Sequence, residues 1–217
     1  MQTRPTGSQV LDELLHGGYE RGIITTLYGP AGSGKSNITL LAAAITEKKC
    51  VFIDTEGSFS VERLRQLNPH IEQLLDNIIL IKITSFSQQT KILTEIQKLV
   101  SIDTEIVIVD GIAAQYRAAM ARGEENINND LSKQINALFA TASEKNIPVV
   151  LTSQVYADLE GEGVKLVGGD IIKYMSKCLL ELQHDERRTI TIRKHRHLPA
   201  GKKTTFVIDT VGIYAEK

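Results

Sequence analysis

A glycine-rich run between an apolar segment and a helix-length segment constrains the fold of this chain most strongly. The run is Gly29-Pro30-Ala31-Gly32-Ser33-Gly34-Lys35-Ser36, and it follows the apolar segment Ile23 to Tyr28. A Gly-x-x-x-x-Gly-Lys-Ser pattern after a strand and before a helix is typical of a phosphate-binding loop, the P-loop. Average residue usage makes a chance match in one such chain an event on the order of 1% or less. The pattern therefore predicts an α/β fold with a nucleotide site at this turn.

The residue types of the P-loop fit the phosphates of a nucleoside triphosphate. Glycines let backbone N–H groups turn toward phosphate oxygens, and the N-terminus of the following helix adds the positive end of its dipole. We expect Lys35 to reach the β and γ phosphates and the Ser36 hydroxyl to ligate Mg²⁺. The expected ligands are therefore ATP and Mg²⁺, and Asn37 completes the run of expected nucleotide contacts.

Short apolar runs alternate with helix-length segments through most of the chain. The predicted strands are Ile23 to Tyr28, Cys50 to Asp54, Ile78 to Ile83, Glu105 to Asp110 and Pro148 to Ser153. The predicted helices are Lys35 to Glu47, Ser60 to Gln66, Gln88 to Val100 and Asn126 to Lys145. Because these strands are apolar on both faces, we expect a mostly parallel sheet with helices on both sides.

The pattern changes after Ser176, where strand-like runs follow one another closely. Lys177 to Gln183, Thr189 to Arg196 and Thr204 to Asp209 are joined by polar turns, which predicts antiparallel strands that extend the sheet. No internal repeat or linker-like composition divides the chain, so we expect one domain over residues 1–217.

Composition narrows the cellular setting and says little about partners. The formal charge is −1, so no overall field points to nucleic acid or membrane. The two cysteines, Cys50 and Cys178, lack the spacing of a disulfide framework or a zinc site. No apolar run reaches the roughly 18 residues that a membrane span needs. We expect a cytoplasmic protein with no membrane partner.

Carboxylates at the ends of two further predicted strands supply the remaining parts of a P-loop site. Asp110 ends the run Glu105 to Asp110, where it is expected to hold the water shell of Mg²⁺. Glu56 lies just beyond the strand that ends at Asp54 and is the better candidate to orient an attacking water, while Asp54 is expected to serve the turn or to support the residues that contact the ligand. A solvated loop charge is the alternative for Glu56.

Several ordered motifs together resemble the RecA/RadA recombinases. They are Thr6-Gly7-Ser8, Leu11-Asp12-Glu13-Leu14-Leu15, Gly17-Gly18, the P-loop, Asp54-Thr55-Glu56-Gly57-Ser58-Phe59, Val109-Asp110 and Thr152-Ser153-Gln154. The match runs from about Thr6 to Gly212, and the resemblance implies a RecA-like core. Within this family the chain most resembles a short archaeal paralogue of RadA, since no helix-hairpin-helix domain or Phe-containing linker precedes the core. That difference argues against a self-assembled filament and against DNA strand exchange.

The resemblance assigns roles to three more side chains. Glu56 looks like the glutamate that activates water, Arg63 like the arginine that stacks on adenine, and Gln154 like the sensor of the γ-phosphate. The alternative for Arg63 is a surface residue of a helix with no ligand. The alternative for Gln154 is a hydrogen-bonding residue at the end of a strand.

A basic segment toward the C-terminus admits three interpretations. Lys194 and Arg196 resemble paired cations that related ATPases insert across a subunit interface to neutralise phosphate charge, which implies a homo- or hetero-oligomer. The wider segment could bind DNA, form that interface finger or be a solvated strand edge, and it contains Arg187, Arg188, Arg193, Lys194, Arg196, Lys202 and Lys203.

In the recombinase family, single-stranded DNA lies along two mobile loops, here about Ala113 to Asn126 and Val155 to Gly169. The resemblance makes five residues the candidate DNA contacts: Tyr116, Arg117, Arg122, Tyr156 and Lys165. Acidic residues in the second loop oppose the phosphate backbone, so we expect weak and salt-dependent binding; they are Asp158, Glu160 and Glu162.

These inferences together predict an ATP-binding, DNA-binding accessory protein of homologous recombination and repair. We expect slow Mg²⁺-dependent hydrolysis, and the expected partners are single-stranded or branched DNA and the main recombinase or other repair proteins. Two rivals remain open at this point: a KaiC-like regulatory ATPase that does not act on DNA, and a non-hydrolysing assembly factor that ATP orders.

Overall fold

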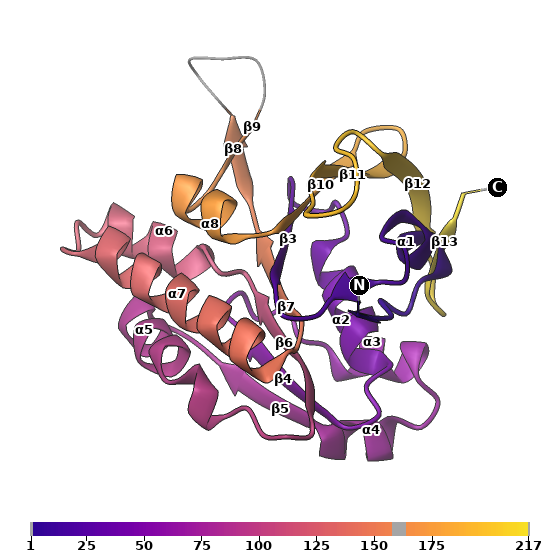
Figure 1. Ribbon diagram of the computed structural model, residues 1–217, viewed down its shortest axis with the longest axis horizontal. Helices are drawn as coiled ribbons and strands as arrows, with labels where there is room; N and C mark the ends of the chain where they lie inside the picture. The colour runs from indigo at the N-terminus through magenta and orange to yellow at the C-terminus, as the bar shows by residue number, and fades with distance from the viewer. Residues whose placement is uncertain (1, 158–163, 217) are drawn as a thin grey trace.

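A nine-stranded sheet forms the centre of the computed structural model, which describes residues 2–157 and 164–216 (Figure 1). Six neighbouring strands run parallel, in the order β10 (Cys178–His184), β3 (Ile24–Tyr28), β7 (Val149–Ser153), β6 (Thr104–Asp110), β4 (Lys49–Asp54) and β5 (Ile78–Lys82). Three antiparallel strands continue the sheet beyond β10: β11 (Arg188–Lys194), β12 (Lys203–Ile208) and β13 (Ile213–Ala215). The predicted fold class, a mostly parallel sheet with antiparallel C-terminal strands, is confirmed.

Helices cover both faces of the sheet because its central strands are apolar on both sides. One face carries α1 (Gln9–Leu14), α2 (Lys35–Ala44), α3 (Val61–Leu67) and α4 (Ile71–Asn77). The other carries α5 (Phe86–Thr94), α6 (Ala114–Ala121), α7 (Ile127–Lys145) and α8 (Gly169–Met175). Along β6, Ile106 and Ile108 enter the first core, whereas Val107 and Val109 enter the second. Each fully buried side chain of this size contributes about 1.5–3 kcal/mol.

The boundaries of one predicted helix are wrong, and side-chain capping explains why. We expected a helix over residues 88–100, but α5 begins at Phe86 because the Ser85 hydroxyl accepts the Gln88 N–H at 3.2 Å. It ends at Thr94, and a short 3-10 helix, η1 (Ile96–Lys98), follows. Both α5 and η1 lie against α7, so the predicted single helix is two elements that share one neighbour.

Several short elements were not predicted. They are α1, α4, α6 and α8, the ribbon of β1 (Thr3–Arg4) with β2 (Tyr19–Glu20), the ribbon of β8 (Val155–Ala157) with β9 (Val164–Leu166), and β13. Elements of two to eight residues have little intrinsic stability, so tertiary packing determines them. Three of them lie within the expected DNA loops, since α6 occupies residues 114–121 of the first and β8 and β9 occupy residues 155–157 and 164–166 of the second.

The N-terminal motif has a structural role. Asp12 accepts hydrogen bonds from the backbone N–H and the hydroxyl of Thr6, at 2.7 and 2.8 Å. The Ser8 hydroxyl donates to the Ile213 carbonyl at 2.7 Å. These contacts attach the start of the chain to the last strand of the sheet, so α1 lies beside β12 and β13 (Figure 1).

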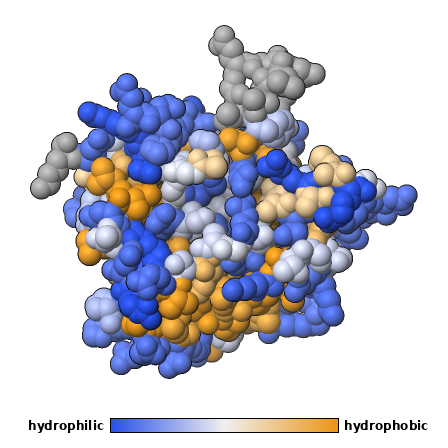
Figure 2. All heavy atoms as spheres, turned by 180° about the vertical axis from the view of Figure 1, so that it is seen from behind, coloured by the Kyte–Doolittle hydropathy of each residue, from blue (hydrophilic) through white to orange (hydrophobic). Residues whose placement is uncertain are grey.

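The surface opposite the view of Figure 1 is mixed in character. Figure 2 shows mostly hydrophilic residues on that side, around an apolar area in the lower half. In the part of the chain that the structure describes, no helix has the length and hydropathy needed to cross a bilayer.

Candidate functional site: a P-loop cleft at the carboxyl edge of the sheet

The P-loop joins the end of β3 to the start of α2, as the sequence predicts. Gly34 has φ +108°, a left-handed backbone conformation that favours glycine, and a Cβ there would lie 2.8 Å from the end of the Ile208 side chain. Lys35 begins α2, and its Nζ donates to the carbonyls of Gly29 and Pro30 at 2.9 and 2.8 Å. The ammonium group is therefore held over the loop.

Beside this loop lies a cleft of about 370 Å³. Residues of the P-loop, α2 and four other strands or strand ends line it: Ala31, Gly32, Gly34, Lys35, Ser36, Asn37, Glu56, Gln154, Arg188 and Ile208. Burial lowers the pKa of Lys35, and the nearby carboxylates of Glu56 and Asp110 partly offset that effect. The cleft combines a phosphate-binding turn, a cation and a carboxylate.

The carboxylate of Asp110 lies at the end of β6 and is held by two hydroxyl groups. Thr152 on neighbouring β7 donates to Oδ1 at 2.6 Å and accepts the Gly111 N–H at 2.7 Å. The Ser58 hydroxyl donates to Oδ2. A carboxylate fixed in this way and the Ser36 hydroxyl in the cleft are hard oxygen donors, so the residues present fit a Mg²⁺ ion with its water shell.

Asp54 fixes the loop that carries Glu56. Its Oδ1 accepts backbone N–H groups of Glu56, Gly57 and Ser58 at 3.2, 2.8 and 3.1 Å. Its Oδ2 accepts the Phe59 N–H at 3.1 Å. Asp54 is 1% exposed, so its carboxylate is bound by these N–H groups and not by water. Asp54 thus serves the turn, one of the two roles expected from its place in the sequence.

Replacing Asp54 with Ala should lower the free energy of unfolding by about 3 kcal/mol, because several N–H groups lose a charged acceptor. Urea denaturation measures this change. The control is Glu62→Gln, which removes an exposed ion pair with Arg65 and should change stability by less than about 0.5 kcal/mol. Equal effects of the two substitutions would contradict a structural role for Asp54.

Glu56 and Gln154 meet between the ends of β4 and β7. Gln154 Nε2 donates to both carboxylate oxygens of Glu56, at 3.2 and 3.3 Å. Burial raises the pKa of Glu56, Asp110 raises it further, and the hydrogen bond from Gln154 opposes both. Gly111, with φ +91°, makes room for this arrangement, since a Cβ there would lie 2.5 Å from Glu56 Cγ.

Gln154 also connects the P-loop cleft to a second cleft. Arg117 on α6 donates to Gln154 Oε1 at 3.2 Å, while the amide of the same side chain holds Glu56. The second cleft measures about 520 Å³ and is lined by Thr55, Glu56, Ala113, Ala114, Arg117, Ala118 and Gln154. Glu56 and Gln154 therefore form the wall between the two clefts.

Arg63 lies on α3 beside α2. Its Nε donates to Asn37 Oδ1 at 3.0 Å, and its NH1 donates to the Thr210 carbonyl and to Gln66, each at 2.9 Å. These bonds hold the guanidinium next to a residue that lines the cleft. The place is compatible with the adenine-stacking role that the resemblance implies.

The structure does not present Tyr116 for base stacking, contrary to our expectation. The ring is 6% exposed and packs edge-on against Phe86, with centroids 6.0 Å apart. Its hydroxyl donates to Asn128 at 2.6 Å. The residue lies in a helix whose buried face includes Tyr116, whereas we placed it in a mobile loop.

The other candidate DNA contacts differ in availability. Tyr156 on β8 is 50% exposed, and β8 pairs with β9, which contains Lys165. Arg122 is exposed and paired with Glu124 at 2.7 Å. The acidic residues expected to oppose DNA lie outside the described residues.

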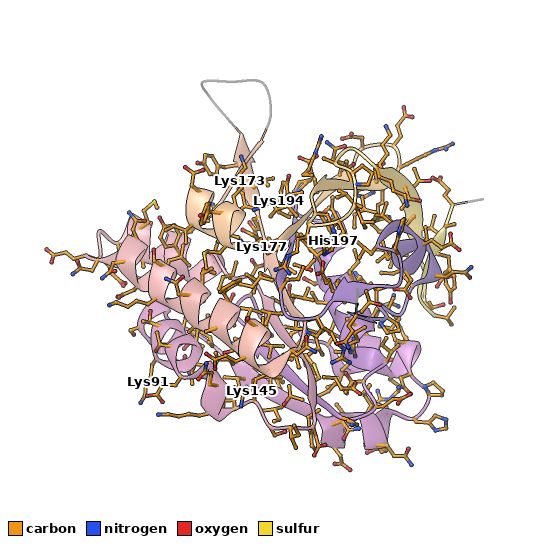
Figure 3. All side chains as sticks on the ribbon, viewed as in Figure 1. Lys91, Lys145, Lys173, Lys177, Lys194 and His197 are labelled. Carbon is orange, nitrogen blue, oxygen red and sulfur yellow. The ribbon has the colours of Figure 1, made fainter. Side chains whose placement is uncertain are left out.

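Lys194 and Arg196, the two cations expected to act across a subunit interface, contact different parts of the chain. Lys194 Nζ donates to the carbonyls of Lys173 and Tyr174 at 2.9 and 3.2 Å, near the end of α8 (Figure 3). Burial lowers the pKa of Lys194, and Lys177 and Lys173 lower it further. Arg196 lies 3.7 Å from the buried carboxylate of Glu20. The two cations thus lie at and just beyond the end of β11, and each contacts a different part of the chain.

Comparison with known proteins identifies the family to which this arrangement belongs. The family model described as Rad51 matches residues 2–216. The chain belongs to the Rad51 family. Within that family it is 36% identical to the DNA repair and recombination protein RadB of Methanobrevibacter smithii, over 96% of this chain and 94% of that protein. It is 39% identical to the protein of the same name from Methanococcus maripaludis, over 92% and 94% of the two chains.

A solved structure supports the same assignment. The crystal structure of the RadB recombinase superposes with a TM-score of 0.87 at 34% identity, covering 98% of this chain and 99% of that one. The RadB protein of Thermococcus kodakarensis is 36% identical over 96% of this chain and 97% of its own. The resemblance to a RadA paralogue is therefore confirmed at the level of the RadB proteins, and membership of the Rad51 family implies nucleotide binding.

Sequence reasoning missed Arg188 as part of the cleft. It appeared only as one member of the basic segment, because its neighbours along the chain are also charged. The position of β11 next to β10, which itself pairs with β3, brings Arg188 to the P-loop. The pairing of β10 with β3, two strands far apart in the chain, could not be predicted from the residue pattern.

Proposed function

We propose that this chain is an ATP-binding, DNA-binding accessory protein of homologous recombination and repair, with weak Mg²⁺-dependent ATPase activity. The observation that carries the proposal is the Glu56–Gln154 pair beside the P-loop cleft, in a chain similar to proteins named for DNA repair and recombination. A carboxylate held by an amide beside a phosphate-binding turn fits the orientation of a water for attack on a terminal phosphate.

The proposed mechanism is in-line attack on the γ-phosphate. Glu56 accepts the proton of the attacking water, and Gln154 fixes the direction of its carboxylate. Lys35 and the P-loop N–H groups stabilise the charge on the phosphate oxygens. Ser36 and Asp110 are the residues that would hold Mg²⁺, which supplies further charge neutralisation when bound.

We also propose that Gln154 couples the nucleotide to DNA. The Arg117 bond and the Glu56 bonds use the two ends of one side-chain amide, so a shift of Gln154 toward a terminal phosphate alters both. Arg117 lies on α6 within the segment expected to face DNA. The remaining Lys194 and Arg196 are proposed to serve a neighbouring subunit, either another copy or the main recombinase.

Weak DNA binding without independent strand exchange is part of this proposal. The formal charge of the chain is −1, and Arg122 on the candidate DNA surface is already paired with Glu124. Each such pair must open before a phosphate is neutralised, which reduces affinity.

Binding of labelled single-stranded DNA tests the DNA part of the proposal. Tyr156→Ala should weaken binding about tenfold at low salt, because one base loses its stacking partner. The control is Tyr214→Ala, since Tyr214 on β13 is 47% exposed and Tyr156 is 50% exposed. Affinity should fall steeply with salt for every variant.

No DNA binding by the wild-type protein, even at low salt, would reject the DNA role and favour a regulatory ATPase. Equal losses for Tyr156→Ala and Tyr214→Ala would place the DNA away from β8.

A further inference from the structure

Arg188 reaches the P-loop cleft from a strand that sequence reasoning did not connect with nucleotide. It is the first residue of β11, opposite His184 on β10 and Phe206 on β12. Strand β10 runs parallel to β3, and β3 leads directly into the P-loop. The turn between β10 and β11 therefore lies at the same edge of the sheet as the phosphate-binding turn.

The side chain of Arg188 is half-buried and lines the cleft with Gly32, Lys35 and Glu56. Its Nε is buried and has no hydrogen-bond partner among the residues that the structure describes. Within the same set of residues, no carboxylate oxygen lies within ion-pair distance of its guanidinium. A buried charged donor without an acceptor is unfavourable, which indicates a site prepared for an acceptor.

Other arginines of the basic segment have carboxylate partners. Arg187, the adjacent residue, is exposed and lies 3.5 Å from Glu216. Arg193 donates to Glu181 through its Nε at 2.7 Å. Arg188 thus differs from these two arginines in two ways: it lines the P-loop cleft, and its Nε has no acceptor among the described residues.

We infer that Arg188 is a second phosphate-binding cation of this cleft, supplied by the same chain that supplies the P-loop. The inference rests on the proposed nucleotide site. A planar guanidinium matches two phosphate oxygens at once, whereas the Lys35 ammonium is a point charge that already contacts two loop carbonyls. Arg188 holds the phosphate chain and does not enter the proton transfer that Glu56 performs.

This role differs from that proposed for Lys194 and Arg196, which need a neighbouring subunit. Arg188 acts on the nucleotide of its own chain, so its contribution is present in a single isolated copy. It also acts on any ligand with a phosphate chain, so ATP and ADP both gain affinity while adenosine does not.

Titration of the full chain with ATP, ADP and adenosine, in the presence of Mg²⁺, tests the inference. Arg188→Gln should weaken ATP and ADP binding about 10- to 100-fold, the effect expected for losing hydrogen bonds between charged groups. Arg188→Lys should weaken binding less, since it keeps the charge and loses the paired geometry. Arg187→Gln is the matched control and should bind like the wild type, because Arg187 points to Glu216.

Two further results separate the inference from the proposed function. Wild-type affinity of Arg188→Gln, together with loss of binding by Lys35→Ala, would overturn the role of Arg188 and leave the nucleotide site intact. Unchanged binding by Lys35→Ala would overturn the nucleotide site itself. A loss of adenosine affinity equal to the loss of ATP affinity would also reject a phosphate contact.

Melting temperatures without nucleotide verify that each variant folds. If Arg188→Gln fails to fold, wild-type ATP affinity of Arg188→Lys overturns the inference.

Discussion

Lys35→Ala is expected to lower the affinity for ATP by about a hundredfold or more. Lys35 is one of the cations that line the P-loop cleft, and its Nζ lies over the loop through bonds to Gly29 and Pro30. Its removal deletes charge-assisted hydrogen bonds to the phosphates, each of which contributes about 1.5–3 kcal/mol. Titration with a fluorescent ATP analogue in the presence of Mg²⁺ measures the change.

The control for this substitution is Lys98→Ala. Lys98 lies in η1, is strongly exposed and pairs with Glu95 at 3.0 Å. It should bind ATP like the wild type. Equal affinities of wild type and Lys35→Ala would show that ATP does not use this loop, and the proposed function would fail with it.

Glu56→Gln is expected to slow ATP turnover by about 10² to 10⁴-fold while ATP binding stays within a few-fold of the wild type. General-base catalysis contributes a factor of this size, and an amide cannot accept the proton. The substitution keeps the size of the side chain and the place beside Gly111, so the P-loop is undisturbed. Steady-state phosphate release and nucleotide titration together separate the two effects.

The pH dependence of turnover provides an independent check on Glu56. Burial raises the pKa of this carboxyl above its ordinary value, and Asp110 raises it further. Because the base must be ionised, turnover should fall as pH decreases through this raised pKa and should reach a plateau above it. Glu56→Gln should lose this dependence along with most of its activity.

Glu72→Gln is the matched control for Glu56→Gln, since Glu72 is an exposed residue of α4 and does not line the P-loop cleft. Its turnover and its pH profile should equal those of the wild type. Full ATP binding with no turnover by the wild-type protein, alone or with DNA and a recombinase, would instead favour an assembly factor that ATP orders.

The sequence predicted where the P-loop and the strand-end residues lie in the fold, because these parts are local or lie at equivalent strand ends. The P-loop is a contiguous run that needs only a preceding strand and a following helix. Asp110, Glu56 and Gln154 each follow an apolar strand, and parallel strands end at one edge of a sheet. Their convergence was therefore expected before any contact was known, and the structure brings Glu56 and Gln154 into hydrogen-bond contact.

The basic segment shows where such reasoning fails. Along the chain it is a single dense cluster of charge, yet its arginines lie among different carboxylates: Arg187 near Glu216, Arg193 near Glu181 and Arg196 near Glu20. Alternation along β11 and the turns at its ends direct successive side chains to different surroundings. Sequence proximity therefore overstated the size of the positive surface.

The sequence by itself determined the P-loop, the apolar strands and the carboxylates that follow them, because these depend on local residue type and period. Only the tertiary structure decided that Tyr116 is buried and that Arg188 lines the P-loop cleft. Each of these depends on which distant strands and helices pack together. Such pairings are set by the free energy of the whole fold and leave no periodic signal in the residues themselves.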